Sequence, residues 1–510
     1  MRRLFSALVA LASATVMVAV PVTASAAQDA ARNCAVGELD VPGTEVVSIT
    51  AGEKPGGTVE YPPGLPIPPV TNVPRYCDVT VTLTHPGVGD KVAVKVWLPV
   101  SGWNGRFQGV GGGGYSMAGW DASMAEAVKL GYAAATTDGG VSTDMSSPAA
   151  WALDANGNVN IELLTNFASR SLHDMAVAGK AVTAQYYGSP AKYSYWNGCS
   201  QGGRQGVMNA QRYPDDYDGI NAMAPAINWN RFAVGGLWAR VVQNEERNQL
   251  TDCELNAFEK AAVDACDKID NVADRVINDP RKCHYNPYDL VGTKIDCDGQ
   301  AVTISRADAE VIRKIWEGAR GWYGFNRGTD LSAVGGPTGF ELSAHWVRYF
   351  IEQNPRYDVT TMSYADYYKA FTEARARYDK LIGTEDPDLS AFRSSGGKMI
   401  TWHGTDDSVI QYQGTVEYRE RVARRTGNVN DYFRVFLAPG VDHCFGGAGA
   451  IPIDPLAAVV DWVEKGKAPA TLPARTLDGS ATRNLCLYPL VSKYIGGDAN
   501  SANSFTCRRG

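Results

Sequence analysis

Apolar residues alternate with polar ones along several short segments of the chain, which is the pattern of strands that bury one face. The clearest is 90–100 (DKVAVKVWLPV), which precedes the glycine run Gly111–Gly114. Short apolar segments predict further strands at 132–137, 193–197, 398–402 and 432–437. Apolar residues at helical spacing predict helices over 166–187, 203–212 and 456–464. Strands that alternate with helices predict an α/β fold with a mostly parallel sheet.

The pattern changes between 228 and 394, where large aromatic residues are scattered among polar segments. We interpret residues 228–394 as a lid-like domain inserted into an α/β core formed by 75–227 and 395–510. Residues 27–74 are expected to form an N-terminal extension. The aromatic residues of the insertion have two open interpretations, since they could bind the flat ring of a ligand or form the insertion's own core.

Composition and charge narrow the class of protein. The chain has 510 residues, enough for about three average domains or for one large enzyme domain with an insertion. Hydrophobic residues make up 45% and charged residues 20%, which excludes a disordered chain and a coiled coil. The net charge is −7, and no run of five or more like charges occurs, so nucleic acid is not an expected partner.

The first 26 residues have the order of a secretory signal peptide. Two arginines follow Met1, an apolar run spans 4–20, and Ala24-Ser25-Ala26 has the form of a cleavage site. Cleavage after Ala26 lowers the basic count from 48 to 46 against 55 acidic residues, which gives a net charge of −9. An uncleaved anchor is the alternative. No later segment reaches about 18 consecutive apolar residues, so we expect a secreted chain that does not enter the membrane.

All ten cysteines follow this segment, and an even number in an exported chain favours disulfides. No C-x-x-C pair occurs, which argues against zinc. The cysteines occupy positions 34, 77, 199, 253, 266, 283, 297, 444, 486 and 507.

The pentapeptide Gly198-Cys199-Ser200-Gln201-Gly202 fits G-x-S-x-G between a predicted strand and a predicted helix. In an α/β-hydrolase fold such a turn exposes the serine hydroxyl above the sheet. Glycines flank the turn because side chains there would clash with the strand and the helix. Ser200 is therefore a candidate nucleophile.

A serine nucleophile needs a base, usually a histidine that a carboxylate orients. In this fold the acid and the histidine follow the serine in the sequence, in loops after later strands. His443 follows the predicted strand 432–437, and Asp407 follows 398–402, with Asp406 as the neighbouring alternative. His403 is expected to be structural, and His173 to be a buried hydrogen-bonding residue.

Two cysteines adjoin these candidates, because Cys199 precedes Ser200 and Cys444 follows His443. If the two cysteines pair, the backbones of Ser200 and His443 are held within about 13 Å of each other. An ordinary structural bridge elsewhere is the alternative.

Taken together, the motifs resemble those of the tannase and feruloyl esterase family. The resemblance rests on Gly-Cys-Ser-Gln-Gly-Gly at 198–203, His-Gly-x-x-Asp at 403–407 and His-Cys-x-Gly-Gly-x-Gly at 443–449, and it covers nearly all of the mature chain. It implies that Ser200 is the nucleophile, that Asp407 rather than Asp406 is the orienting acid, and that His443 is the general base. It also implies the bridge Cys199–Cys444.

An acyl-transfer site also needs an oxyanion hole made of backbone N–H groups. The amide of Gln201 supplies one by position, and the second is expected from the glycine loop, from Gly112 or Gly113. The family usually has an Asn in this loop, where this chain has only glycine. A merely tight turn is the alternative.

Four aspartates lie between Cys266 and Cys283, and three of them, at 267, 270 and 274, are spaced three and four residues apart, with Asp279 further on. From their spacing alone, a solvated acidic loop is the default interpretation. The resemblance instead implies a structural Ca²⁺ site in the lid, since oxygen ligands suit this ion. The implied ligands are Asp267, Asp270 and Asp274 with the carbonyl oxygens of Val272 and Val276.

Four further bridges are predicted. The short loops around the acidic segment favour Cys266–Cys283 nested within Cys253–Cys297, although the second pair departs from the family pattern. The others are Cys34–Cys77 and Cys486–Cys507, of which the latter would hold the C-terminal tail.

The sequence thus predicts a secreted serine esterase that acts on a small aromatic ester, such as a plant-derived phenolic ester. The resemblance implies esters of phenolic acids, with feruloyl or chlorogenate-type esters first, galloyl esters second and mono(2-hydroxyethyl) terephthalate a distant third. The alternative of another class is a non-catalytic extracellular binding module on a hydrolase scaffold. The intact Ser, Asp and His set argues against that module.

Overall fold

The structure is a computed structural model, and it describes residues 34–63 and 67–510. The expected signal peptide, 1–26, lies outside these ranges. None of the helices in the described ranges is long and apolar enough to cross a membrane.

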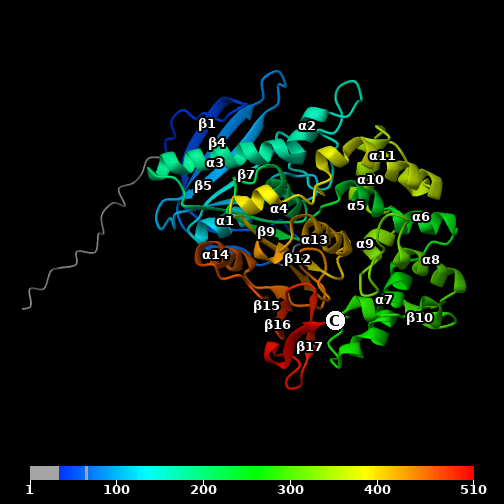
Figure 1. The fold of residues 1–510 in the computed structure, drawn as a ribbon. Coiled ribbons are helices and arrows are strands. Elements are labelled where there is room, and N and C mark those ends of the chain that lie inside the picture. Colours follow the sequence, from blue (N-terminus) through cyan, green and yellow to red (C-terminus); the bar gives the residue numbers. More distant parts are fainter. Residues whose placement is uncertain (1–33, 64–66) are drawn as a thin grey trace, which may run out of the picture.

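A nine-stranded sheet forms the centre of the molecule (Figure 1). Its strand order is β1-β4-β5-β7-β6-β8-β9-β12-β13. The strands from β7 to β13 in this order are parallel, whereas β1, β4 and β5 pair antiparallel. The strands are β1 (Glu45–Lys54), β4 (Tyr76–Thr84), β5 (Val92–Pro99), β6 (Arg106–Val110), β7 (Ala133–Thr137), β8 (Tyr193–Cys199), β9 (Gly219–Met223), β12 (Lys398–Gly404) and β13 (Phe433–Ala438). The mostly parallel sheet is therefore present, and the expected N-terminal extension contributes its edge strand β1.

Helices cover both faces of this sheet. On one face lie α1 (Asp121–Lys129) and α14 (Pro455–Lys465), and on the other lie α3 (Ser171–Tyr187), α4 (Gln201–Arg212) and α13 (Gln413–Thr426). Successive buried residues of one strand enter different layers, as Tyr195 and Trp196 of β8 do. The segment 166–187 differs from the expected single helix, because its first five residues form a π-helix, η1 (Asn166–Arg170), after α2 (Ile161–Thr165).

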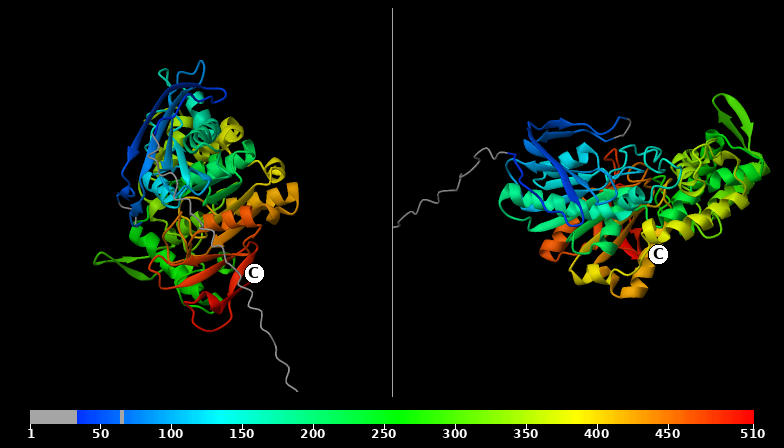
Figure 2. Two further views of the ribbon diagram at one scale, coloured as in Figure 1. Left: turned by 90° about the vertical axis from the view of Figure 1, so that its left-hand side faces the viewer. Right: turned by 90° about the horizontal axis from the view of Figure 1, so that it is seen from above.

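The segment between β9 and β12 forms a mainly helical insertion, although these two strands are neighbours in the sheet. Figure 2 shows it projecting to one side of the sheet. Several of its aromatic residues, including Trp346 and Phe350, are fully buried and pack within it. Its elements are α5 (Trp229–Gly235), α6 (Trp238–Glu245), α7 (Asp252–Cys266), β10 (Lys294–Cys297), β11 (Gln300–Thr303), α8 (Arg306–Glu317), α9 (Ser332–Gly335), α10 (Glu341–His345), the π-helix η5 (Trp346–Ile351), α11 (Tyr364–Ile382) and α12 (Ser390–Ser394).

Smaller elements complete the described chain. β2 (Gly57–Val59) pairs with β3 (Val70–Val73). A three-stranded sheet, β14 (Ile451–Pro452), β15 (Thr471–Arg475) and β16 (Thr482–Cys486), precedes the hairpin β17 (Leu490–Tyr494) and β18 (Phe505–Arg509). Short 3₁₀ turns are η2 (Asp267–Asp270), η3 (Pro280–Lys282), η4 (Pro287–Leu290), η6 (Val359–Thr361), η7 (Val429–Asp431) and η8 (Ala502–Ser504).

Five disulfides join the described cysteines, and none of these is left free. Their pairing agrees with the predicted one, including Cys253–Cys297, where the family pattern gave the least guidance. The bridges are Cys34–Cys77, Cys199–Cys444, Cys253–Cys297, Cys266–Cys283 and Cys486–Cys507.

Candidate active site

Ser200 lies at the sharp turn between β8 and α4, with φ 61° and ψ −122°. A non-glycine residue rarely has a positive φ, so surrounding contacts must hold it there. The Ser200 carbonyl oxygen accepts hydrogen bonds from the backbone N–H groups of Arg204 and Ala226, both at 3.0 Å. A Cβ atom on Gly198 would come within 2.7 Å of the carbonyl carbon of Gly202, which explains a glycine at this position.

His443 lies in the loop after β13 and reaches the serine hydroxyl. Its Nε2 is 2.9 Å from Ser200 Oγ, and its Nδ1 is 2.8 Å from Asp407 Oδ2. When Nδ1–H donates to the carboxylate, Nε2 is the acceptor that takes the serine proton. The geometry can thus activate Ser200 as a nucleophile.

Asp407 is held in place from several sides and is fully buried. Its Oδ1 accepts hydrogen bonds from the backbone N–H groups of Val409 at 2.8 Å and Ile410 at 2.7 Å. Its Oδ2 also lies 3.0 Å from Nε2 of His403, a buried residue whose Nδ1 is 2.8 Å from Thr415 Oγ1. Burial alone would raise the pKa of Asp407, but the charges and hydrogen bonds of His443 and His403 hold it well below its usual range. Asp407 is therefore ionised and fixed.

Asp407 also influences the titration of the histidine. Burial alone would lower the pKa of His443, but the charge and hydrogen bond of Asp407, together with the charge of Asp442, raise it above its usual value. Asp442 Oδ1 accepts hydrogen bonds from the N–H groups of Ser408 at 2.8 Å and His443 at 2.7 Å. The imidazolium that forms during proton transfer is thus stabilised.

The alternative acid, Asp406, has different surroundings. Its Oδ1 accepts a hydrogen bond from Thr405 Oγ1 at 3.1 Å, and the structure brings Asp407, not Asp406, to the His443 ring. Burial, aided by the charges of Glu259 and Asp442, raises the pKa of Asp406 to about 7. His173, expected to be buried, is partly exposed and lies 2.8 Å from Asp216 Oδ2.

The bridge Cys199–Cys444 joins the two loops that carry Ser200 and His443, and its Cα atoms are 6.0 Å apart. Cys444 has φ 62°, so the bridge connects this strained residue to Cys199, the neighbour of the strained Ser200. The loop that carries the histidine is thus tied to the nucleophile turn.

The two glycines considered for the oxyanion hole differ in whether their N–H groups are already hydrogen-bonded. The Gly112 N–H donates to Gln205 Oε1 at 3.0 Å, so this amide is already used. The Gly112 carbonyl accepts from the Gly202 N–H at 2.8 Å, which ties the glycine loop to α4. Neither Gln201 nor Gly113 donates its N–H to another described residue. Of the two glycines, Gly113 is therefore the one whose N–H, like that of Gln201, is not engaged by another described residue.

The cavity beside Ser200 is small, about 20 Å³. Its lining contains no charged side chain. The Tyr115 hydroxyl donates to the Leu342 carbonyl at 2.7 Å, whereas Ser343 Oγ and Trp229 Nε1 are buried without a partner among the described residues. The lining residues are Gly114, Tyr115, Ser200, Gln201, Ala226, Trp229, Phe232, Ala233, Leu342, Ser343, Val409 and Ile410.

A family model described as tannase and feruloyl esterase matches residues 77–345 and 340–508. The chain belongs to the tannase and feruloyl esterase family. A probable feruloyl esterase of Arthroderma benhamiae is 45% identical over 495 residues, which cover 92% of each protein. Members of this family are carboxylic ester hydrolases, and this chain is one of them.

Solved structures from the tannase and feruloyl esterase family have the same fold. Tannin acyl hydrolase from Aspergillus niger has a TM-score of 0.81 at 27% identity and 92% coverage of both chains. Feruloyl esterase B from Aspergillus oryzae has a TM-score of 0.78 at 27% identity, with 92% of this chain and 98% of that one covered.

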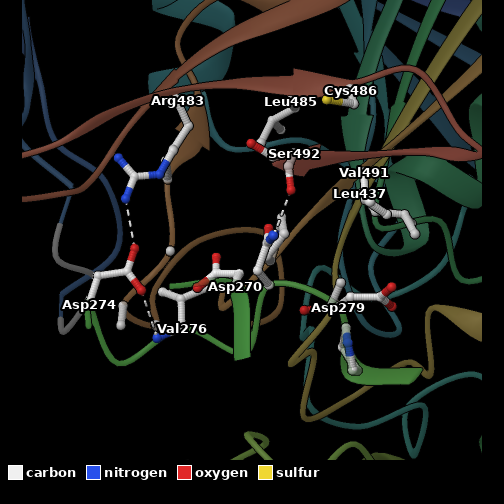
Figure 3. A pocket seen from close by; sticks show the side chains of 18 of the residues that line it. Asp270, Asp274, Val276, Asp279, Leu437, Arg483, Leu485, Cys486, Val491 and Ser492 are labelled. Atoms are coloured by element: carbon white, nitrogen blue, oxygen red, sulfur yellow. Dashed lines mark hydrogen bonds and ion pairs between the residues drawn. The ribbon is translucent and has the colours of Figure 1, made fainter. Parts of the chain in front are cut away.

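The acidic loop of this family member borders a second, larger cavity of about 730 Å³, to which none of Ser200, Asp407 and His443 contributes (Figure 3). Asp267 Oδ1 accepts hydrogen bonds from two backbone N–H groups of the loop, those of Asp274 at 3.0 Å and Arg275 at 2.9 Å. Asp270 and Asp274 likewise accept from the N–H groups of Val272 at 3.0 Å and Val276 at 3.2 Å.

The charges of this loop are only partly balanced. Asp274 Oδ2 pairs with Arg483 at 2.7 Å, as Figure 3 shows. Burial, followed by the charges of Asp274 and Asp267, raises the pKa of Asp270 to about 6. Over the described ranges, no three His, Cys, Asp or Glu side chains are grouped closely enough to hold a metal ion. The carboxylates repel one another, and their hard oxygen donors are of the type that calcium prefers.

Sequence reasoning missed three residues that support the active site around Ser200, namely Gln205, Arg204 and Asp442. Gln205 lies on the same face of α4 as Gln201, four residues later, which is the only signal that could have pointed to it. Arg204 and Asp442 adjoin known motifs but carry no pattern of their own.

Proposed function

We propose that this protein is a secreted serine esterase that hydrolyses esters of aromatic acids, with hydroxycinnamoyl esters of the feruloyl or chlorogenate type as its preferred class. The observation that carries this proposal is the continuous hydrogen-bonded series from Ser200 through His443 to Asp407. Family membership and the names of the relatives, which include probable feruloyl esterases, support the substrate class. The five disulfides fit an oxidising, extracellular environment.

In the proposed mechanism, Ser200 Oγ attacks the ester carbonyl while His443 Nε2 takes its proton. The negative oxygen that develops is stabilised by the N–H groups of Gln201 and Gly113. His443 then protonates the departing alcohol, which leaves an acyl-enzyme on Ser200. Water attacks this ester with His443 again acting as base, and the aromatic acid is released.

We assign the core to the α/β-hydrolase type and residues 228–394 to a lid. Five of the twelve residues that line the cavity beside Ser200 come from this insertion, namely Trp229, Phe232, Ala233, Leu342 and Ser343. A cavity that binds benzene needs a volume on the order of 150 Å³. Because the observed cavity measures about 20 Å³, an aromatic acyl group enters only when its walls move apart.

The chemistry of this cavity favours a hydroxycinnamoyl group over a galloyl group. Three adjacent phenolic hydroxyls would each need a hydrogen-bond partner when buried. The only unused polar side-chain groups of the described lining are Ser343 Oγ and Trp229 Nε1. A ring with one hydroxyl (feruloyl) or two (the caffeoyl ring of chlorogenate) is therefore accommodated at lower cost than a ring with three.

We also propose that the acidic loop binds a structural Ca²⁺ ion. Asp267, Asp270 and Asp274 would hold it, with the carbonyl oxygens of Val272 and Val276, once the ion draws the three carboxylates closer together than they lie in the structure. The unbalanced charge at Asp270 supports this assignment. When bound, the ion would neutralise the negative charge of the loop and stabilise its conformation. Its role would be structural, since Ser200 does not line this cavity.

The test compares kcat/KM for methyl ferulate, chlorogenate and methyl gallate, with Ser200→Ala as the inactive control. We expect the first two to exceed methyl gallate, and a fluorophosphonate probe to label the native protein but not the variant. A galloyl preference would reverse the substrate assignment and favour the tannase alternative. Absence of both turnover and labelling would favour the non-catalytic binding module.

A further inference from the structure

Arg204 is a fully buried cation that the mechanism above does not use. It lies on α4 four residues after Ser200, and its side chain makes four hydrogen bonds within the described structure. None of these acceptors is a carboxylate. Burial lowers the pKa of Arg204 to about 9, so the guanidinium is charged at neutral pH. A buried charge without a counter-ion destabilises a fold, which suggests that it has a role.

The π-helix η1 supplies part of the cradle of this guanidinium. Arg204 Nη2 donates to the Phe167 carbonyl and Nη1 donates to the Ala168 carbonyl, both at 2.8 Å. A π-helix shifts the regular backbone hydrogen bonds and makes carbonyl groups available to other donors. Thr384, which follows the C-terminal end of α11, adds its hydroxyl at 3.2 Å from Nη1. The guanidinium is thus fixed from two sides by groups outside α4.

Two further contacts direct Arg204 toward the reaction centre. Its Nε donates to Gln201 Oε1 at 2.7 Å, and Gln201 carries one of the proposed oxyanion N–H groups. The guanidinium also lies 5.7 Å from the ring of Trp229, which lines the cavity beside Ser200. Helical side chains tilt toward the N-terminus of their helix, so the charge approaches the end of α4 where Ser200 lies.

We propose, on the basis of the esterase function proposed above, that Arg204 is a positioning residue for ester hydrolysis. It fixes Gln201 so that its backbone N–H meets the oxyanion. Its unpaired charge also stabilises the negative oxygen of the tetrahedral intermediate, which is absent from the neutral substrate. Selective stabilisation of the intermediate raises kcat and leaves substrate binding almost unchanged.

The expected size of the effect of the Arg204 charge on kcat follows from Coulomb's law. Arg204 lies about one helical turn, roughly 6 Å of rise, after Ser200. At a separation on the order of 8 Å and an effective dielectric constant of about 20, a unit charge would change the rate by roughly 30-fold. Arg204→Gln should therefore lower kcat about 30-fold, while KM stays within about threefold. Arg204→Lys keeps the charge but loses the planar fork, so its kcat should stay within about fivefold of the native value.

Arg212 provides a matched control on the same helix, two turns further from Ser200. It also connects α4 to η1 and to the end of α11, through Ser169 Oγ at 2.8 Å and the Leu381 carbonyl at 3.1 Å. Arg212→Gln removes comparable structural contacts without removing a charge near the oxyanion. We expect it to lower the melting temperature but leave kcat within about twofold.

The deciding experiment measures kcat, KM and melting temperature for these variants on methyl ferulate, together with inhibition by an aryl trifluoromethyl ketone. This ketone forms an anionic adduct with the serine, so its inhibition constant should rise with the loss of kcat in Arg204→Gln. If Arg204→Gln does not fold, Arg204→Met is the second neutral variant, since an apolar residue removes the cost of the buried charge.

The proposal is overturned if the neutral Arg204 variant and Arg212→Gln have the same kcat, if the loss lies in KM, or if Arg204→Lys is as slow as the neutral variant. Failure of the native protein to hydrolyse any ester or to react with a fluorophosphonate would instead overturn the proposed function itself.

Discussion

The bridge between Cys199 and Cys444 offers the most direct test of how the active site is held together. It links positions 245 residues apart and closes a loop that contains the whole insertion. The chain-entropy model gives a stabilisation of roughly 5.5 kcal/mol for such a loop. The nested bridges Cys253–Cys297 and Cys266–Cys283 shorten the effective loop, so about 5 kcal/mol is the expected upper value.

Its local effect on catalysis should be separable from this stability. Ser200 and Cys444 both have positive φ values, 61° and 62°, and each such non-glycine residue costs on the order of 1–3 kcal/mol. Without the bridge these two turns can relax independently. A displacement of about 1 Å between the nucleophile and its base can lower the rate by about 100-fold. We therefore expect Cys199→Ala/Cys444→Ala to fold and to lose 10- to 100-fold in kcat, by the same estimate.

The control is the double variant Cys34→Ala/Cys77→Ala, which removes a bridge with a separation of 43 residues. The same model gives it roughly 4 kcal/mol, a comparable loss of stability, but this bridge joins no residue of the active site. Calorimetry would give both melting temperatures, and kcat would be measured well below them. Equal kcat values for the two double variants would show that packing alone aligns Ser200 with His443.

Three further results are expected. Asp406→Asn should keep activity and raise the free energy of unfolding at pH 8 by up to about 4 kcal/mol. The pKa of the native carboxyl is about 7 in the folded protein and about 4 in the unfolded chain, so the native protein loses stability as the pH rises from about 4 to 7. Chemical denaturation at pH 4 and 8 should show the gain only at pH 8. Asp442→Asn removes a charge that raises the pKa of His443, so the acid limb of kcat/KM should move to lower pH, and an unmoved limb would exclude this influence. Chelation should lower the melting temperature of the native protein but not of Asp270→Asn, and elemental analysis without calcium would refute the proposed ion.

Much of the sheet could be predicted because its strands are either fully buried or alternate clearly. The predicted strand 398–402 corresponds to β12, and 432–437 corresponds to β13. β1, β4, β6 and β9 were not predicted. β1 is an edge strand whose residues are mostly exposed, so apolar residues do not mark it. The order of strands across the sheet also has no local signal, since it depends on pairing between distant segments.

In the candidate site, too, residues marked by local sequence motifs could be predicted, whereas contacts between distant segments could not. The positions of Ser200, Asp407 and His443 followed from motifs and their order along the chain. The choice between Gly112 and Gly113 did not, because it depends on a hydrogen bond from Gly112 to Gln205, 93 residues away. Arg204 was missed for a similar reason, since its partners in η1 and at Thr384 are brought together only by the fold.

The adjacency of β9 and β12 in the sheet has a consequence for how the enzyme is made. Gly219 pairs with Lys398, so the sheet cannot be completed until the intervening insertion has been synthesised and has closed on itself. Contacts of such long range form late, because the entropy of loop closure opposes them. Ser200 precedes this junction, whereas Asp407 and His443 follow it. A chain interrupted before β12 therefore carries the nucleophile without its base, and hydrolytic activity arises only in the last stage of folding.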